Sequence, residues 1–118
     1  MTTFEERILN KVRDHLGDDR AENSIIYLDH NLKSPSQQLH VGDAVLNLPW
    51  NGHIAFVDLE PGFNWGHLCL YLAIPLDDKE VIEWRAQMPP FLKTETSAFQ
   101  LLWRGPLAPQ WAVATNQA

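Results

Sequence analysis

The 118-residue chain carries a formal net charge of −6 at pH 7, which argues against non-specific binding to nucleic acid or an anionic membrane, because both need a basic surface. Its longest apolar run, residues 68–74, is too short to cross a bilayer, and we see no secretory signal segment. Cys69 is the single cysteine, so an internal disulfide and a cysteine-rich zinc site are excluded. We therefore expect one globular domain over residues 1–118, in the cytoplasm.

The N-terminal segment predicts an amphipathic helix from Thr3 to Leu16. Thr3 and Glu6 fit a capping box, and Gly17 suits the left-handed position that follows a helix. One face of this helix is apolar and should pack on a sheet. The residues of that face are Phe4, Ile8, Leu9, Val12 and Leu16.

Three short segments follow this helix. Their composition predicts a polar linker over Asp18–Asn23, a short strand over Ser24–His30 and a loop over Asn31–Gln38.

Alternating apolar residues then predict strands over Asp43–Leu48, His53–Glu60 and His67–Leu76. Asn51-Gly52 between the first two favours a type I′ hairpin turn. For the next hairpin we place Glu60 opposite His67, so that Val57 faces Leu70.

A fourth strand is predicted over Glu80–Met88, with Trp84 opposite Leu72. We also expect a short helix over Thr94–Trp103 and a final edge strand over Trp111–Thr115. The pattern thus predicts an α+β two-layer sandwich, in which the N-terminal helix packs on a four-stranded or larger antiparallel meander. Leu46, Val57, Leu70 and Trp84 should then share a core with Ile8 and Val12.

The same register places a row of polar residues on the opposite face, formed by Asp43, Glu60 and His67 with Asp58 nearby. Two carboxylates and an imidazole in one row are suited to a divalent metal ion or to acid–base chemistry. Ordinary solvated surface charge is the competing explanation. Cys69 lies in the middle of an apolar strand, so we interpret it as a small buried hydrophobe.

Aromatic residues suggest a second candidate site. The loop between the two middle strands carries Phe63 and Trp65, which either cover a sheet edge or present a contact surface to a ligand or partner. Phe56, Tyr71 and Arg85 share one row in the predicted register and, together with Trp65, could line a pocket.

Residues 52–57, with the sequence Gly-His-Ile-Ala-Phe-Val, resemble the glycine–histidine strand of the NlpC/P60 and CHAP cysteine amidases. In those families the nucleophilic cysteine precedes this strand. Here Cys69 follows it, so the resemblance does not extend to the catalytic pair.

The sequence is compatible with three functions. The first is a small protein-binding module of the inhibitor or immunity type, whose acidic and aromatic surface meets a basic protein. The second is a metal-binding or acid–base enzyme that uses Asp43, Glu60 and His67. The third is a small-molecule binder with an aromatic pocket. No sequence motif specifies a cofactor, and the absence of a catalytic signature favours the first function.

Overall fold

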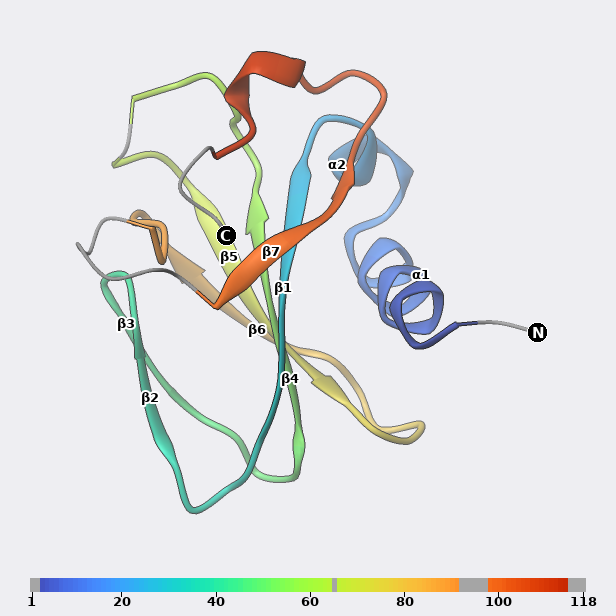
Figure 1. Ribbon diagram of the computed structural model, residues 1–118, viewed down its shortest axis with the longest axis vertical. Coiled ribbons are helices and arrows are strands. Elements are labelled where there is room, and N and C mark those ends of the chain that lie inside the picture. The colour runs from blue at the N-terminus through green and yellow to red at the C-terminus, as the bar shows by residue number, and fades with distance from the viewer. Residues whose placement is uncertain (1–2, 65, 92–97, 115–118) are drawn as a thin grey trace.

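The computed structural model describes residues 3–64, 66–91 and 98–114 and has an α+β fold (Figure 1). A five-stranded antiparallel sheet has the strand order β6-β5-β4-β1-β7, and a smaller sheet pairs β2 with β3. The predicted α+β class is confirmed, with a large sheet of five strands rather than four. The elements are α1 (Phe4–Leu16), α2 (Asp18–Glu22), β1 (Ile25–Lys33), β2 (Gln38–Val41), β3 (Ala44–Asn47), β4 (Gly52–Asp58), β5 (Cys69–Pro75), β6 (Ile82–Ala86), β7 (Phe99–Arg104) and the 3-10 turn η1 (Gln110–Ala112).

The ends of α1 are those that the sequence predicts. The Glu6 N–H donates to the Thr3 hydroxyl at 3.1 Å, and Gly17 has a φ of 82° while its N–H donates to the Arg13 carbonyl. The predicted linker Asp18–Asn23 is instead the short helix α2, so that prediction is wrong. Burial of Ala21 against the core accounts for the ordered turn.

The central hairpin β4–β5 has the predicted register, with Val57 opposite Leu70 and Asp58 opposite Cys69. The β5–β6 register is wrong by one residue, because Trp84 lies opposite Tyr71 rather than Leu72. A shift of one residue moves every side chain of a strand to the other face of the sheet.

The strand predicted over Ser24–His30 is confirmed as β1, although it continues to Lys33, and β2 begins at Gln38, so the predicted loop Asn31–Gln38 is too long. The place of β1 in the sheet, between β4 and β7, was not predicted. The predicted helix over Thr94–Trp103 is wrong where the chain is described, because Phe99–Arg104 form β7 beside β1. Residues 94–97 lie outside the described residues. The edge strand predicted over Trp111–Thr115 is also wrong, since residues 110–112 form η1 and Thr115 is not described.

The predicted hairpin between the 43–48 strand and β4 does not form. That strand is β3, and it pairs with β2 across the two-residue turn Gly42-Asp43, where Gly42 has a φ of 54°. Asn51-Gly52 is therefore not a type I′ turn, and no described residue other than glycine has a positive φ. Gly52 begins β4 instead, where a Cβ atom would lie 2.5 Å from the Ile74 carbonyl oxygen.

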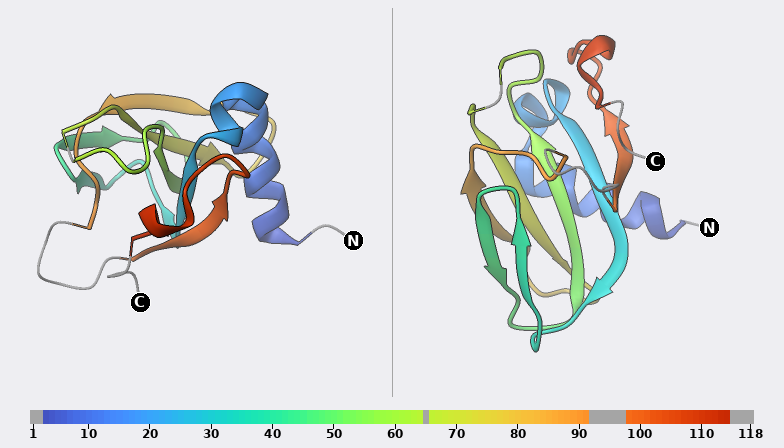
Figure 2. Two further views of the ribbon diagram at one scale, coloured as in Figure 1. Left: turned by 90° about the horizontal axis from the view of Figure 1, so that it is seen from above. Right: turned by 60° about the vertical axis from the view of Figure 1, so that its left-hand side comes forward.

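Both faces of the large sheet are buried. The α1 side brings Val57 and Leu70 together with Ile8 and Val12, as predicted, whereas Leu46 and Trp84 belong to the opposite side. There the β2–β3 hairpin and Phe91 cover the sheet, and Figure 2 shows this hairpin and α1 on opposite sides of it. The main buried residues of this second cluster are Ile25, Tyr27, Leu46, Leu48, Ile54, Phe56, Cys69, Tyr71 and Phe91.

Candidate functional site

A buried acid–histidine pair lies at the end of the central hairpin. His67 Nε2 is 2.7 Å from Asp58 Oδ1, and the two side chains are only 7% and 4% exposed. The Glu60 N–H also donates to Asp58 Oδ1, at 3.2 Å. Asp58 ends β4 and His67 precedes β5, so the hairpin register itself brings these two side chains together.

The hydrogen bonds of His67 determine how many protons the pair holds. Its Nδ1 lies 2.9 Å from the Asn64 carbonyl oxygen, which can only accept, so Nδ1 carries a hydrogen. A second hydrogen must lie between Nε2 and Asp58 Oδ1 for that contact to be a hydrogen bond. The pair is therefore either an imidazolium with a carboxylate or a neutral imidazole with a carboxylic acid.

Burial and hydrogen bonding act on Asp58 in opposite directions. Burial raises the pKa of its carboxyl group above the ordinary value, and the hydrogen bond and charge of His67 lower it again. The net pKa is raised because desolvation disfavours the charged form of an acid.

A cavity of about 220 Å³ opens beside Asp58, and we call it the Asp58 cavity. Two mostly exposed aromatic side chains border it, Phe63 at 67% and Trp111 at 75%. The loop that follows β4 and the turn η1 supply these rings, and both lie at the same end of the sheet in Figures 1 and 2. The cavity is lined by Asp58, Gly62, Phe63, Asn64, Trp111 and Ala112.

The predicted row of Asp43, Glu60 and His67 is not assembled by strand pairing. The Asp43 carboxylate accepts hydrogen bonds from the backbone N–H groups of Gln87 and Met88, and Glu60 Oε1 accepts from the Leu68 N–H. In residues 3–64, 66–91 and 98–114, no three His, Cys, Asp or Glu side chains form a group that could hold a metal ion. Metal binding by these residues stays a prediction without geometric support.

The residues of the predicted aromatic site are separated in the structure. Phe56 and Tyr71 are fully buried and contact each other, with ring centroids 5.1 Å apart. Arg85 is exposed and lies opposite Leu70, hence on the α1 side of the sheet. Phe63 is 67% exposed, and Trp65 lies outside the described residues.

Cys69 is fully buried, in agreement with its interpretation as a small hydrophobe. Its thiol lies 3.7 Å from the Met88 carbonyl oxygen, and burial raises the pKa of Cys69 to about 12. A thiol with such a pKa is protonated at neutral pH and is a poor nucleophile.

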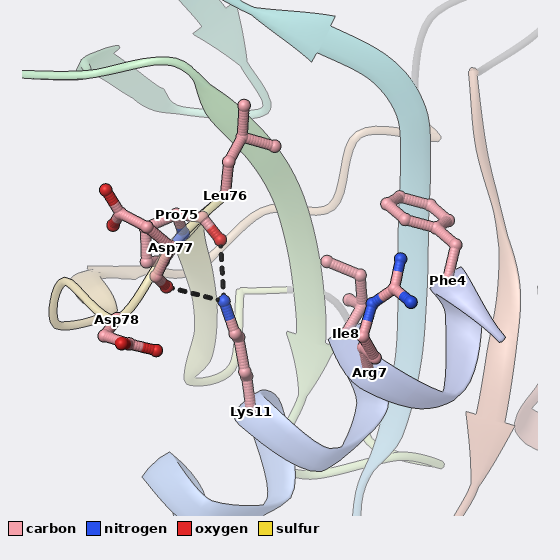
Figure 3. Close-up of a pocket in the computed structure, with 8 residues that line it drawn as sticks. All are labelled: Phe4, Arg7, Ile8, Lys11, Pro75, Leu76, Asp77 and Asp78. Atoms are coloured by element: carbon pink, nitrogen blue, oxygen red, sulfur yellow. Dashed lines mark hydrogen bonds between the residues drawn. The ribbon is translucent and has the colours of Figure 1, made fainter. Parts of the chain in front are cut away.

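A second cavity, of about 270 Å³, lies between α1 and the chain after β5 (Figure 3). Lys11 Nζ reaches across it and donates to the Pro75 and Asp77 carbonyl oxygens at 2.9 and 2.8 Å. These two hydrogen bonds join α1 to the chain that follows β5. We therefore assign this region a structural role.

Comparison of the chain with models of protein families, with curated proteins and with solved structures found no match. None of the helices in the described part of the chain is long and apolar enough to span a membrane.

The alternating pattern of the strands predicts Asp58 near the polar row but does not identify His67 as its partner. In the predicted register Asp58 faces Cys69, and His67 is the diagonal neighbour two residues away, which is within reach of a long side chain. This diagonal relation is the feature of the sequence that points to the Asp58–His67 pair. No sequence signal brought Trp111 to the loop that carries Phe63, because the two are distant in the chain.

Proposed function

We propose that this chain is a cytoplasmic protein-binding module that holds a basic partner protein against the end of the sheet carrying Phe63 and Trp111. The observation that carries this proposal is the pair of mostly exposed aromatic rings beside the Asp58 cavity. Aromatic side chains with an apolar body are enriched at protein interfaces and supply much of their binding energy.

The charge of the chain supports a basic partner. The net charge is −6, and charge complementarity steers association and suppresses wrong partners. The unreactive thiol of Cys69 supports a binding role over nucleophilic catalysis. A single free cysteine is also compatible with the cytoplasm, where thiols stay reduced.

A phage-displayed peptide library tests the proposal. Panning on the parent protein, with removal of phage that bind a Phe63→Ala/Trp111→Ala double variant, should enrich peptides rich in arginine and lysine. The double variant should bind the synthetic peptides about tenfold or more weakly. Leu107→Ala is the matched control, because Leu107 is 65% exposed but does not line the cavity. If no peptide distinguishes the parent from the double variant, the proposal is wrong.

A metal-binding or acid–base function is the second candidate. Its acid–base form is favoured by the 2.7 Å contact between His67 Nε2 and Asp58 Oδ1 beside the cavity, whereas the described residues form no group that could hold a metal ion. An NMR titration of the His67 ring with Zn²⁺, in the parent and in Glu60→Gln, tests it. Zinc should shift or broaden the ring signals of the parent and act more weakly on the variant. An absence of any response to zinc would remove this candidate.

A further inference from the structure

The Asp58 cavity has the size of a site for one side chain. Its volume of about 220 Å³ is below the roughly 300–1,000 Å³ that is usual for small-molecule and cofactor sites. A protein partner can fill such a space with one long residue, which acts as an anchor at the interface.

The walls of the cavity are aromatic because of Gly62. This residue has a φ of 94°, and a Cβ atom built on it would lie 2.9 Å from the Trp111 ring. The absence of a side chain at this position lets the indole lie directly on the loop, next to Phe63. Faces of Trp and Phe rings attract cations through their π electrons, and guanidinium groups stack on them.

The polar side of the cavity is the Asp58 carboxyl group, and its second oxygen has spare hydrogen-bonding capacity. Asp58 Oδ1 accepts from His67 and Glu60, whereas no described residue donates to Oδ2. The Asp58 side chain is 4% exposed, so a donor that reaches Oδ2 meets little competition from water. Asn64 also lines the cavity.

Of the described residues that line the cavity or bond to Asp58, only His67 can carry a positive charge, and it is already bonded to Asp58. Glu60 adds negative charge beside Asp58. Tyr27 lies close enough to feel the charge of Asp58, and burial raises the pKa of its hydroxyl to about 12, so it stays neutral.

We propose that the Asp58 cavity receives one arginine side chain of the basic partner, stacked between Phe63 and Trp111 with its guanidinium bonded to Asp58. This inference rests on the proposed function and names the chemical group that the site recognises. The guanidinium matches the cavity because it is planar, always charged and rich in N–H donors.

Small probes test the inference without knowledge of the partner. N-acetyl-arginine methylamide should shift the backbone NMR signals of Gly62, Phe63, Asn64 and Trp111 in the full-length protein in a saturable way. The citrulline analogue has almost the same shape but no charge, and it should bind about tenfold or more weakly. Equal shifts from both probes would overturn the inference.

Variants assign the binding to this cavity. Trp111→Ala and Phe63→Leu should each weaken the arginine probe about tenfold, and Asp58→Asn should do the same while keeping a hydrogen-bonding side chain at this position. Leu107→Ala should leave binding unchanged. Circular dichroism confirms that each variant is folded. Because Phe63 and Trp111 are on the surface, their variants decide the question even if Asp58→Asn is unstable. Full binding by both surface variants would overturn the inference.

Selected peptides separate the two proposals. Replacing the basic residues of a selected peptide one at a time by citrulline or norleucine should abolish binding at one arginine. If every replacement is tolerated while binding still needs Phe63 and Trp111, the arginine site is wrong and the binding function stands. If no peptide depends on these rings, the proposed function itself fails.

Discussion

The two ends of β4 bury polar side chains to a similar extent, but with different consequences. At its C-terminal end Asp58 is bonded to His67 and Glu60 and lines a cavity. At its N-terminal end His53 is 6% exposed, and its Nδ1 has no hydrogen-bond partner. The His53 ring packs edge-on against Phe4 of α1, with ring centroids 4.9 Å apart.

This difference separates a polar site from a packing contact. A buried polar group keeps its charged form only when hydrogen-bond partners compensate for the lost contact with water. Asp58 has such partners, so it can act on a ligand. His53 has no hydrogen-bond partner at Nδ1, and burial lowers its pKa. Its ring is therefore neutral and acts as an aromatic packing residue against α1.

Replacement of Asp58 should cause the largest loss of stability. Asp58→Leu leaves His67 Nε2 without its hydrogen-bond partner, and breaking a buried pair in this way costs about 3–5 kcal/mol of unfolding free energy. Urea denaturation measures it. The double variant Asp58→Leu/His67→Leu should regain part of that loss, because no unpaired polar group remains. A single variant within about 1 kcal/mol of the parent would show that the pair is not stabilising.

At the other end of β4, Gly52→Val should cost about 1–3 kcal/mol through overpacking. A Cβ atom at this position would lie 2.5 Å from the Ile74 carbonyl oxygen and 2.7 Å from the Trp50 ring. Gly52→Ala should already show most of the loss, since the Cβ atom itself makes the close contact. Thermal unfolding checks both variants, and an Ala variant as stable as the parent would contradict the close approach.

Lys11→Met should cost about 1 kcal/mol, since it removes two hydrogen bonds that join α1 to the chain after β5. Lys79→Met is the control. It removes an exposed ion pair with Asp77 and should cause no measurable change. If the two variants are equally stable, the Lys11 bonds do not fasten the helix.

The smallest expected effect is a pH dependence due to His53. Because the pKa of His53 is lowered in the folded state, the unfolded chain binds a proton first as the pH falls. The contribution of His53 to stability is therefore fully present above the ordinary histidine pKa and is lost as the pH falls toward the folded-state pKa. His53→Leu should flatten this part of the stability profile, measured by urea denaturation at several pH values. His40→Gln, at an exposed position of β2, is the control. An unchanged profile in His53→Leu would assign the dependence to other groups.

Short-range patterns in the sequence determined α1 and the β4–β5 hairpin. Thr3, Glu6 and Gly17 specify both ends of α1 through local hydrogen bonds, which need no other part of the chain. The β4–β5 register followed from one loop length and two alternating strands, and it placed Val57 opposite Leu70 as observed.

Other features were decided only by tertiary structure. Asn51-Gly52 does not form the predicted hairpin, because β4 pairs with β1 and β5, and β3 instead pairs with β2 across the turn Gly42-Asp43. β6 is offset by one residue from its predicted register, which no local pattern reveals when both faces of the sheet are buried. The Asp58 cavity depends on η1 returning to the loop after β4, and such a contact between distant segments is set by packing rather than by local sequence.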